Sequence, residues 1–159
     1  MTRTPSLFNL LHHEHVEIKE PLQRLVSTFE HPARQFDYGA LEEVCLEIAH
    51  HMQLEEKCLY SLMRTSTELK DLAEEATLEH MECKRLIKQL GHPKTLSHSE
   101  LKVKVTHLQL LLESHIEAEE TVTIPRIQET LPAEAIRTLV KQMEAFKLRP
   151  VARHKLTPV

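Results

Sequence analysis

His51-Met52-Gln53-Leu54-Glu55-Glu56 recurs in near copy further along the chain as His115-Ile116-Glu117-Ala118-Glu119-Glu120. In each copy a histidine precedes a glutamate by four residues, which places both side chains on one face of an α-helix, one turn apart. A shorter doublet precedes each copy, Glu14-His15 before the first and Glu79-His80 before the second. The chain therefore carries one pattern twice, and its four histidines and two glutamates form a set of potential metal ligands.

The composition favours a single all-helical domain. A chain of 159 residues is long enough for one domain with its own core. It has 2 glycines and 4% aromatic residues, and both low values favour helix over sheet. The net charge is −4 with acidic and basic residues interleaved, so no basic patch predicts nucleic-acid binding. No apolar run is long enough to span a bilayer.

The cysteine content and the start of the chain indicate a cytoplasmic protein. Three cysteines are an odd number in no CxxC pattern, which suggests a reducing compartment. The first residues, Met1–Ser6, contain no hydrophobic segment of a signal peptide. We therefore expect a protein that binds neither nucleic acid nor membrane. The sequence leaves the oligomeric state open.

Apolar residues spaced by three and four predict four long amphipathic helices and a shorter fifth. The predicted helices cover about residues 6–30, 38–64, 65–90, 97–125 and 133–147. Short connections between the first four favour an up-down-up-down four-helix bundle, followed by the short C-terminal helix. Residues 1–147 then form one domain. Residues 148–159 contain two prolines and no periodicity, which predicts a loosely ordered tail.

Capping residues and prolines predict where these helices begin and end. Asp37 is an expected N-cap of the second helix, while Thr65–Glu68 and Ser97–Glu100 match capping boxes for the third and fourth. Pro21 predicts a kink or a break in the first helix. Pro125 predicts that the fourth helix ends or bends there.

Each long helix has an apolar stripe that is interrupted near its middle by polar residues. The interrupting residues are His15, His51 with Glu55, His80, and His115 with Glu119. Burying these groups without partners would cost on the order of several kcal/mol each. Six convergent nitrogen and oxygen ligands instead suit a pair of ions, with the two glutamates as bridges and two histidines for each ion. Imidazole and carboxylate without thiolate favour Fe or Mn over structural Zn.

This ligand assignment depends on the helix register. A shift by one residue would exchange the chosen ligands for neighbours such as His50, Glu56 or Glu120, and the regular spacing of the stripes disfavours that shift. Ferritin-like di-iron proteins are a different class, because they need a Glu-x-x-His pair on each of two helices. Only Glu47-x-x-His50 has that spacing, away from the centre of its stripe.

The chain resembles the hemerythrin-like, or HHE cation-binding, family over about residues 7–125. The matching motifs are Leu11-x-x-Glu14-His15, His51-x-x-x-Glu55-Glu56, Glu79-His80 and His115-x-x-x-Glu119-Glu120, with Pro125 closing the last. The resemblance implies a four-helix bundle around two non-haem Fe ions that are bridged by carboxylates and an oxo or hydroxo group. Carried over by position, the ligands are His15, His51, Glu55, His80, His115 and Glu119.

One position departs from the oxygen-carrying members of the resembled family. They have a further histidine four residues after the position of His80, where this chain has Lys84. The remaining ligand set is that of members associated with peroxide, nitric oxide or iron–sulfur repair chemistry. Tyr60 resembles a tyrosine common in the family; it is either packed with its hydroxyl near solvent, or a ligand or hydrogen-bond donor at the centre. His12, one turn before His15, is a surface residue or a further ligand or donor.

These observations lead to three functional hypotheses besides a plain structural bundle. The first is a di-iron protein that reacts with small ligands derived from O2. Its specific reaction is then either peroxide disproportionation, as in a catalase-like oxidoreductase, or O2 binding. The second is a sensor or binding module for O2, NO or iron without turnover. The third is NO-linked repair of iron–sulfur clusters. It ranks lower because family members with that role often carry an additional N-terminal domain with a cysteine.

Overall fold

Every regular element that the computed structural model describes, in residues 3–149, is a helix. Two of the five helical runs contain a π-helical turn, and a short 3-10 helix lies between the third and fourth runs. In chain order the elements are α1 (Leu7–Thr28), α2 (Tyr38–Leu54), η1 (Glu55–Tyr60), α3 (Ser61–Met63), α4 (Lys70–Gln89), η2 (Pro93–Thr95), α5 (His98–Ala118), η3 (Glu119–Thr123), α6 (Ile124–Thr130) and α7 (Ala133–Lys147). The predicted all-α class is thus confirmed for the described residues.

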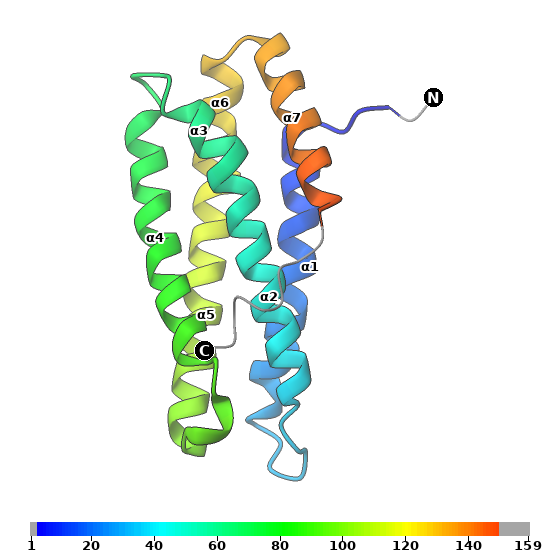
Figure 1. Ribbon diagram of the computed structural model, residues 1–159, viewed down its shortest axis with the longest axis vertical. Coiled ribbons are helices and arrows are strands. Elements are labelled where there is room, and N and C mark those ends of the chain that lie inside the picture. Colours follow the sequence, from blue (N-terminus) through cyan, green and yellow to red (C-terminus); the bar gives the residue numbers. More distant parts are fainter. Residues whose placement is uncertain (1–2, 150–159) are drawn as a thin grey trace.

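The long helices lie side by side along the long axis of the molecule, an arrangement compatible with a helical bundle (Figure 1). Helix α1 packs against α2 and α5, and α4 packs against the same two helices. Helix α7 lies against α1, α2 and η1, near one end of the bundle. The predicted loose tail falls almost entirely on residues 150–159, which lie outside the described residues.

Two helix starts carry the caps that the sequence predicted, Asp37 and Ser97, and α1 carries a further cap, Ser6. Ser6 Oγ accepts a hydrogen bond from the Asn9 amide at 3.0 Å, and Asp37 Oδ1 accepts one from Ala40 at 2.9 Å. Ser97 and Glu100 form a complete capping box at the start of α5. These side chains bond to amides of the first helical turn that have no partner within the helix.

The capping box predicted at Thr65–Glu68 is wrong. Helix α4 begins later, at Lys70, and no side chain caps it. Ser66 Oγ accepts only from the Glu68 amide, at 3.3 Å, while its carbonyl accepts from the amides of Leu69 and Lys70 at 3.2 and 3.0 Å. A backbone turn thus binds the amides that a side-chain cap would otherwise bind.

Neither internal proline ends its helix. Helix α1 continues through Pro21 to Thr28, because the neighbouring Ile18 and Leu22 are buried in the core and hold the chain across the missing hydrogen bond. Pro125 stands in the first turn of α6, directly after the π-helical turn η3, and the helix continues beyond it. A residue without an N–H is tolerated in a first turn.

The π-helical turn η1 shifts the helix register by one residue. Continuing the alternating spacing of three and four residues from His51 and Glu55 places Cys58 and Leu62 on the core face. Both are only partly buried in the structure. Leu59 and Met63 are fully buried in their place. A π-helical turn closes hydrogen bonds from residue i to i+5 and so accommodates one extra residue. Every side chain after Glu55 is therefore rotated relative to the α-helical prediction.

The second π-helical turn, η3, has the same effect in the second half of the chain. Continuing the helical spacing from His115 and Glu119 places Val122 on the core face, but Val122 is 47% exposed and Thr123 is buried instead. Both π-helical turns begin at the glutamate of a His-x-x-x-Glu pair, Glu55 and Glu119. The repeat noted in the sequence is thus also a repeat of this backbone irregularity.

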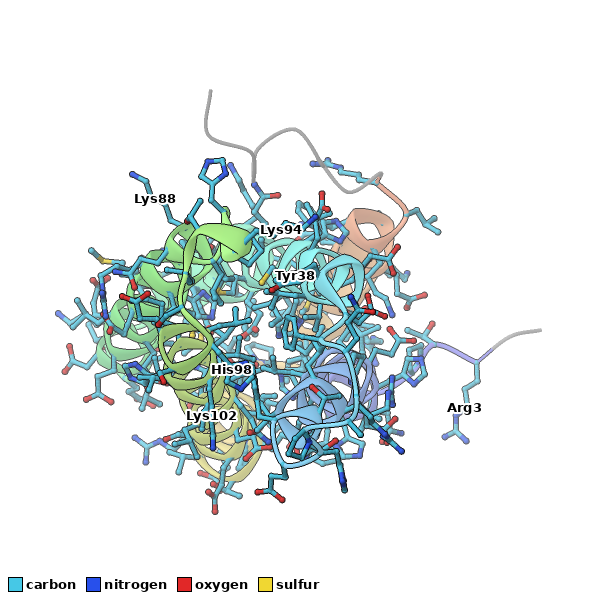
Figure 2. All side chains as sticks on the ribbon, turned by 90° about the horizontal axis from the view of Figure 1, so that it is seen from below. Arg3, Tyr38, Lys88, Lys94, His98 and Lys102 are labelled. Atoms are coloured by element: carbon cyan, nitrogen blue, oxygen red, sulfur yellow. The ribbon has the colours of Figure 1, made fainter. Side chains whose placement is uncertain are left out.

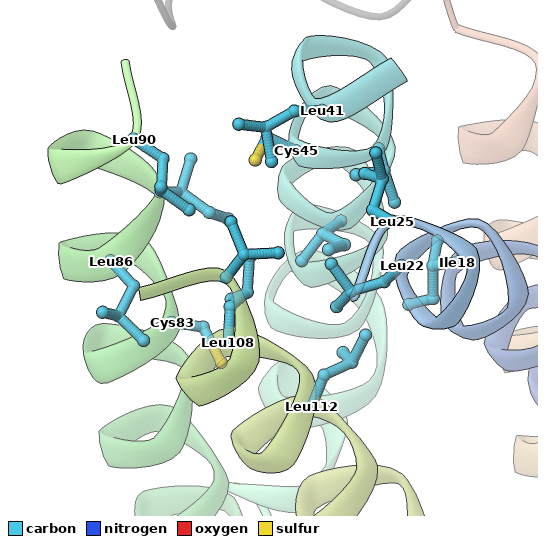
Figure 3. Packing of buried hydrophobic residues seen from close by; sticks show 14 of the residues in the cluster. Ile18, Leu22, Leu25, Leu41, Cys45, Cys83, Leu86, Leu90, Leu108 and Leu112 are labelled. Carbon is cyan, nitrogen blue, oxygen red and sulfur yellow. The ribbon is translucent and has the colours of Figure 1, made fainter. Parts of the chain in front are cut away.

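Two hydrophobic clusters fill the interior. Figure 3 shows the first, in which Leu22, Leu41 and Leu108 from three helices meet Cys83 from a fourth. The second contains Leu11, Leu54, Tyr60 and residues of α7. All three cysteines are free thiols.

Charged side chains lie on the outer surface of the helices, together with a few exposed apolar residues such as Leu78, Met81 and Val103. Figure 2, seen from one end of the molecule, shows charged side chains such as Arg3 and Lys88 pointing away from the helices. None of the helices in the described residues has the length and apolar character needed to cross a membrane.

Candidate metal centre

The six residues predicted as ligands converge in the interior. None has more than 4% of its surface exposed: His15, His51, Glu55, His80, His115 and Glu119. Two triplets among them bring one ligand atom per residue within 4.8 Å of one another: His15, His51 and Glu55, and Glu55, His80 and His115. Because Glu55 belongs to both triplets, the geometry provides two adjacent positions for cations that share a carboxylate.

Both buried carboxylates lie between the two histidine pairs. Glu55 places Oε1 against His51 Nε2 and Oε2 at 3.6 Å from His115 Nε2. Glu119 places Oε1 at 3.4 Å from His15 Nε2 and Oε2 at 3.3 Å from His115 Nε2. Each glutamate therefore points one oxygen toward each half of the repeat, which is the geometry that a bridging carboxylate requires.

Four further glutamates surround the histidines. Each histidine directs Nε2 inward and Nδ1 toward a glutamate on another helical run. The Nδ1-to-carboxylate distances are 2.9 Å for His15–Glu120, 3.5 Å for His51–Glu14, 3.8 Å for His80–Glu56 and 2.9 Å for His115–Glu79. Such an outer carboxylate orients the imidazole ring and favours the proton on Nδ1, so that the Nε2 lone pair faces the centre.

The sequence contained a signal for these four glutamates, although no role was assigned to them. Glu14 and Glu79 each precede the single histidine of a repeat, and Glu56 and Glu120 each follow a predicted glutamate ligand. The two halves use them equivalently. Glutamates of the first kind contact the histidine of the His-x-x-x-Glu pair, and those of the second kind contact a single histidine.

The inner atoms of the site fit a pair of cations. His15 Nε2, His51 Nε2, Glu55 Oε1 and Glu119 Oε1 are buried and make no hydrogen bond. His80 Nε2 and His115 Nε2 face each other at 3.2 Å. Buried lone pairs without donors are unfavourable unless a cation or proton lies between them. A donor set of imidazole nitrogens and carboxylate oxygens suits Fe, Mn, Co or Zn.

A comparison with known families agrees with this geometry. The sequence model of the hemerythrin HHE cation-binding domain matches residues 6–127, which is most of the chain. The chain belongs to the hemerythrin HHE cation-binding family. Neither the comparison with curated proteins nor that with solved structures found a significant match. The match to the HHE domain includes all six convergent residues and ends within α6, before α7 begins at Ala133.

Tyr60 is the residue of this HHE domain whose position the sequence left most open. It is 0% exposed, so the hydroxyl does not lie near solvent. Its Oη lies 2.7 Å from Glu55 Oε2, 2.9 Å from Glu119 Oε2 and 3.2 Å from His80 Nε2. The π-helical turn explains this position, since its i to i+5 bonding returns Tyr60 to the face of Glu55.

His12 and Lys84 lie outside the centre of the HHE domain. His12 is exposed, stacks on Phe8, and reaches Glu120 Oε1 with Nδ1 at 2.9 Å, so it contacts the centre only through that outer glutamate. Lys84, at the position of the additional histidine of the oxygen carriers, donates to Glu56 Oε2 at 2.9 Å. Neither side chain belongs to the two ligand triplets.

The surrounding charges shift the pKa values of this HHE domain in opposite directions. Burial alone would lower the pKa of His51, but the charge of Glu55 and the Glu14 and Glu55 carboxylates beside its two ring nitrogens raise it to about 10. The pKa of His115 is also raised well above its usual value, since hydrogen bonds to Glu119, Glu55 and Glu79 outweigh burial. Burial opposes ionisation of Glu14, yet hydrogen bonds with His51 and Lys147 lower its pKa to about 2.

Metal uptake is therefore expected to release protons. With a pKa of about 10, His51 is protonated at neutral pH in the metal-free protein, and only neutral imidazole binds a metal ion. Titrating Co²⁺ into weakly buffered protein at pH 7.5, followed with an indicator dye, should release about one to two protons per chain. The apparent affinity should rise ~10-fold per pH unit for each proton released. Proton-independent uptake would contradict the raised pKa values.

Proposed function

We propose that this HHE domain is a non-haem di-iron protein whose reaction is peroxide disproportionation. The observation that carries the proposal is the position of Glu55, which is shared by two triplets of nitrogen and oxygen ligands. When bound, two adjacent iron ions would supply a two-electron redox couple. One peroxide molecule would take up two electrons and two protons to give two water molecules, and a second would give up two electrons and two protons to give O2. The proposed ligands are His15, His51, Glu55, His80, His115 and Glu119.

The residues of the chain would hold the ions, fix their geometry and keep bulk water out. The outer glutamates orient the histidine rings, while the two hydrophobic clusters contribute side chains from every helical run around the centre. The proposal takes residues 1–147 as one domain with four long helices that alternate in direction.

Lys84 supports reactivity with peroxide over simple oxygen carriage. It occupies the position of the additional histidine of the oxygen carriers and pairs with Glu56 at the outside of the centre. Its ammonium group carries no lone pair for a metal ion. One ion would therefore lack the third histidine that the carriers provide, which favours an exchangeable position for a small ligand.

The function is tested by the oxygen that iron-loaded protein evolves from hydrogen peroxide, measured with an oxygen electrode. We expect evolution well above that of a His51→Ala/Glu55→Ala variant at equal protein concentration. A matched control is His13→Ala/Glu17→Ala, which removes a His-x-x-x-Glu pair of the same spacing from the exposed face of α1. The control should keep the activity. Equal oxygen evolution from all three proteins would refute the proposal.

One observation favours a second candidate, a binding module for O2 or NO without turnover. Helix α7 follows the matched family domain, and its Lys147 contacts Glu14 Oε1 at 2.8 Å, while Glu14 Oε2 faces His51. Binding of a ligand at the centre could therefore alter the packing of α7, which lies outside the matched residues 6–127. Reversible NO binding without peroxide consumption would favour this alternative.

A further inference from the structure

A small pocket connects the surface with one side of the centre. It has a volume of about 150 Å³ and lies between α4, the end of α5 and η3. Buried His115 and Glu119 line it together with Ala76 and Ala118, and the carboxylates of Glu75 and Glu79 also line it. Ala118 and Glu75 are exposed to solvent, so the pocket extends from solvent to two proposed ligands.

The internal repeat allows a comparison with the opposite side of the centre. The positions that correspond to Ala76 and Ala118 carry Leu11 and Leu54 in the first half of the chain. Leu11 and Leu54 are 0% and 1% exposed, whereas Ala118 is exposed. The pocket on the side with the leucines, which Glu14 and Leu54 line, therefore reaches none of the six proposed ligands. On the side with the alanines, the pocket reaches His115 and Glu119.

Helix α7 closes the side with the leucines. Leu11 and Leu54 belong to the same buried cluster as Val140 and Met143 of α7. Figure 1 shows α7 beside α1, whereas no corresponding helix of the described residues covers the outer side of α4. The two halves are therefore equivalent in their ligands but differ in their access to solvent.

The size and charge of the pocket indicate what it admits. A volume of about 150 Å³ holds only a few water molecules, since each occupies roughly 30 Å³ in the liquid. Three glutamates, Glu75, Glu79 and Glu119, and no lysine or arginine are among the described residues that line it. These carboxylates create a negative electrostatic potential, which the low-dielectric walls of a narrow pocket strengthen. The potential repels anions and does not act on neutral molecules.

We propose that small ligands reach the centre through this pocket, and that Ala118 and Glu75 make it selective for neutral molecules over anions. The inference rests on the proposed function, because it assumes that metal ions occupy the centre. Ala118 sets the width of the opening, and Glu75 places a negative charge beside it. Hydrogen peroxide and nitric oxide are neutral and small enough to pass.

The route is tested by the rate at which nitric oxide binds to iron-loaded, reduced protein, followed by stopped-flow absorption. Ala118→Phe should slow association by about tenfold or more with unchanged iron content, because the ring fills the opening. Ala118→Leu, which copies Leu54 of the other half, should slow it to a smaller degree. The control is Ser114→Phe, one turn earlier on α5 at an exposed position outside the pocket, which should bind at the original rate.

The charge selectivity is tested with azide, an anionic probe. Glu75→Lys should raise the association rate of azide by about three- to tenfold at low ionic strength, with the gain diminishing in salt, and leave that of nitric oxide unchanged. Unchanged nitric oxide rates in both Ala118 variants with full iron content would overturn the route and leave the proposed function intact. Unchanged azide rates in Glu75→Lys would overturn the selectivity. Protein that takes up no iron would instead refute the proposed function.

Discussion

Replacing Glu55 with alanine is expected to abolish the binding of both metal ions. Glu55 is the one residue common to the two ligand triplets, and its two oxygens face different histidines, His51 and His115. The Glu55→Ala substitution removes a carboxylate ligand from both proposed metal positions at the same time. His15→Ala removes a residue of one triplet only, so it should reduce the metal content to about one ion per chain instead of about two.

Thermal stability provides an independent measurement of the same loss. A ligand that binds only the folded protein stabilises it by about 4 kcal/mol at ~1000 times its dissociation constant. Metal should therefore raise the melting temperature of the original protein strongly and leave that of Glu55→Ala almost unchanged. Glu17→Ala, on the exposed face of α1, is the control and should behave like the original protein. Two ions per chain in Glu55→Ala by elemental analysis would contradict the shared-carboxylate geometry.

The repeat in the sequence was sufficient to bring the ligands together. The spacing of His51 and Glu55, and of His115 and Glu119, requires a helix if both members are to face one point. Apolar stripes on either side place that point in the interior. Helical periodicity therefore predicts the positions of all six residues, because the last of them in each half, Glu55 or Glu119, is also the first residue of a π-helical turn.

The register beyond the ligands could not be predicted, because a π-helical turn has no periodicity of its own in the sequence. Cys58 and Val122 fit the α-helical spacing, and only the backbone of η1 and η3 moves Leu59 and Thr123 into their places. π-Helical turns are rare and are found frequently at functional sites. Here both begin at a buried glutamate of the centre, where they determine which side chain follows the ligand onto the inner face.

The position of α7 against the centre also could not be predicted from the sequence. The amphipathic pattern predicts that α7 is a helix but not which groove it occupies. Its position depends on tertiary contacts, namely Met143 in the buried cluster and Lys147 against Glu14. These contacts cover one half of the repeated set of candidate ligands, which agrees with our proposal of access through the other half.

Replacing Tyr60 with phenylalanine is expected to destabilise the metal-free protein more than the metal-loaded protein. Glu55 Oε2 and Glu119 Oε2 both lie within hydrogen-bond distance of the buried hydroxyl. Burial and these two carboxylates raise the pKa of Tyr60 well above its usual value, so the phenol keeps its proton and donates it to one of them. Removing the donor leaves a buried carboxylate without that partner, which should lower the free energy of unfolding by about 1–3 kcal/mol.

Metal ions should compensate for most of this loss, because the carboxylates then have cations as partners. Chemical denaturation of the metal-free and metal-loaded forms of Tyr60→Phe measures the difference. Tyr38→Phe is the matched control, since Tyr38 is the only other tyrosine and contacts Lys94 and Phe36 away from the centre. If Tyr60 is only a hydrogen-bond donor, the ferric forms of the original protein and of Tyr60→Phe should have the same visible spectrum. A phenolate-to-iron band that disappears in Tyr60→Phe would instead make Tyr60 a metal ligand, and the hydroxyl would then occupy the position that we assign to an exchangeable small molecule.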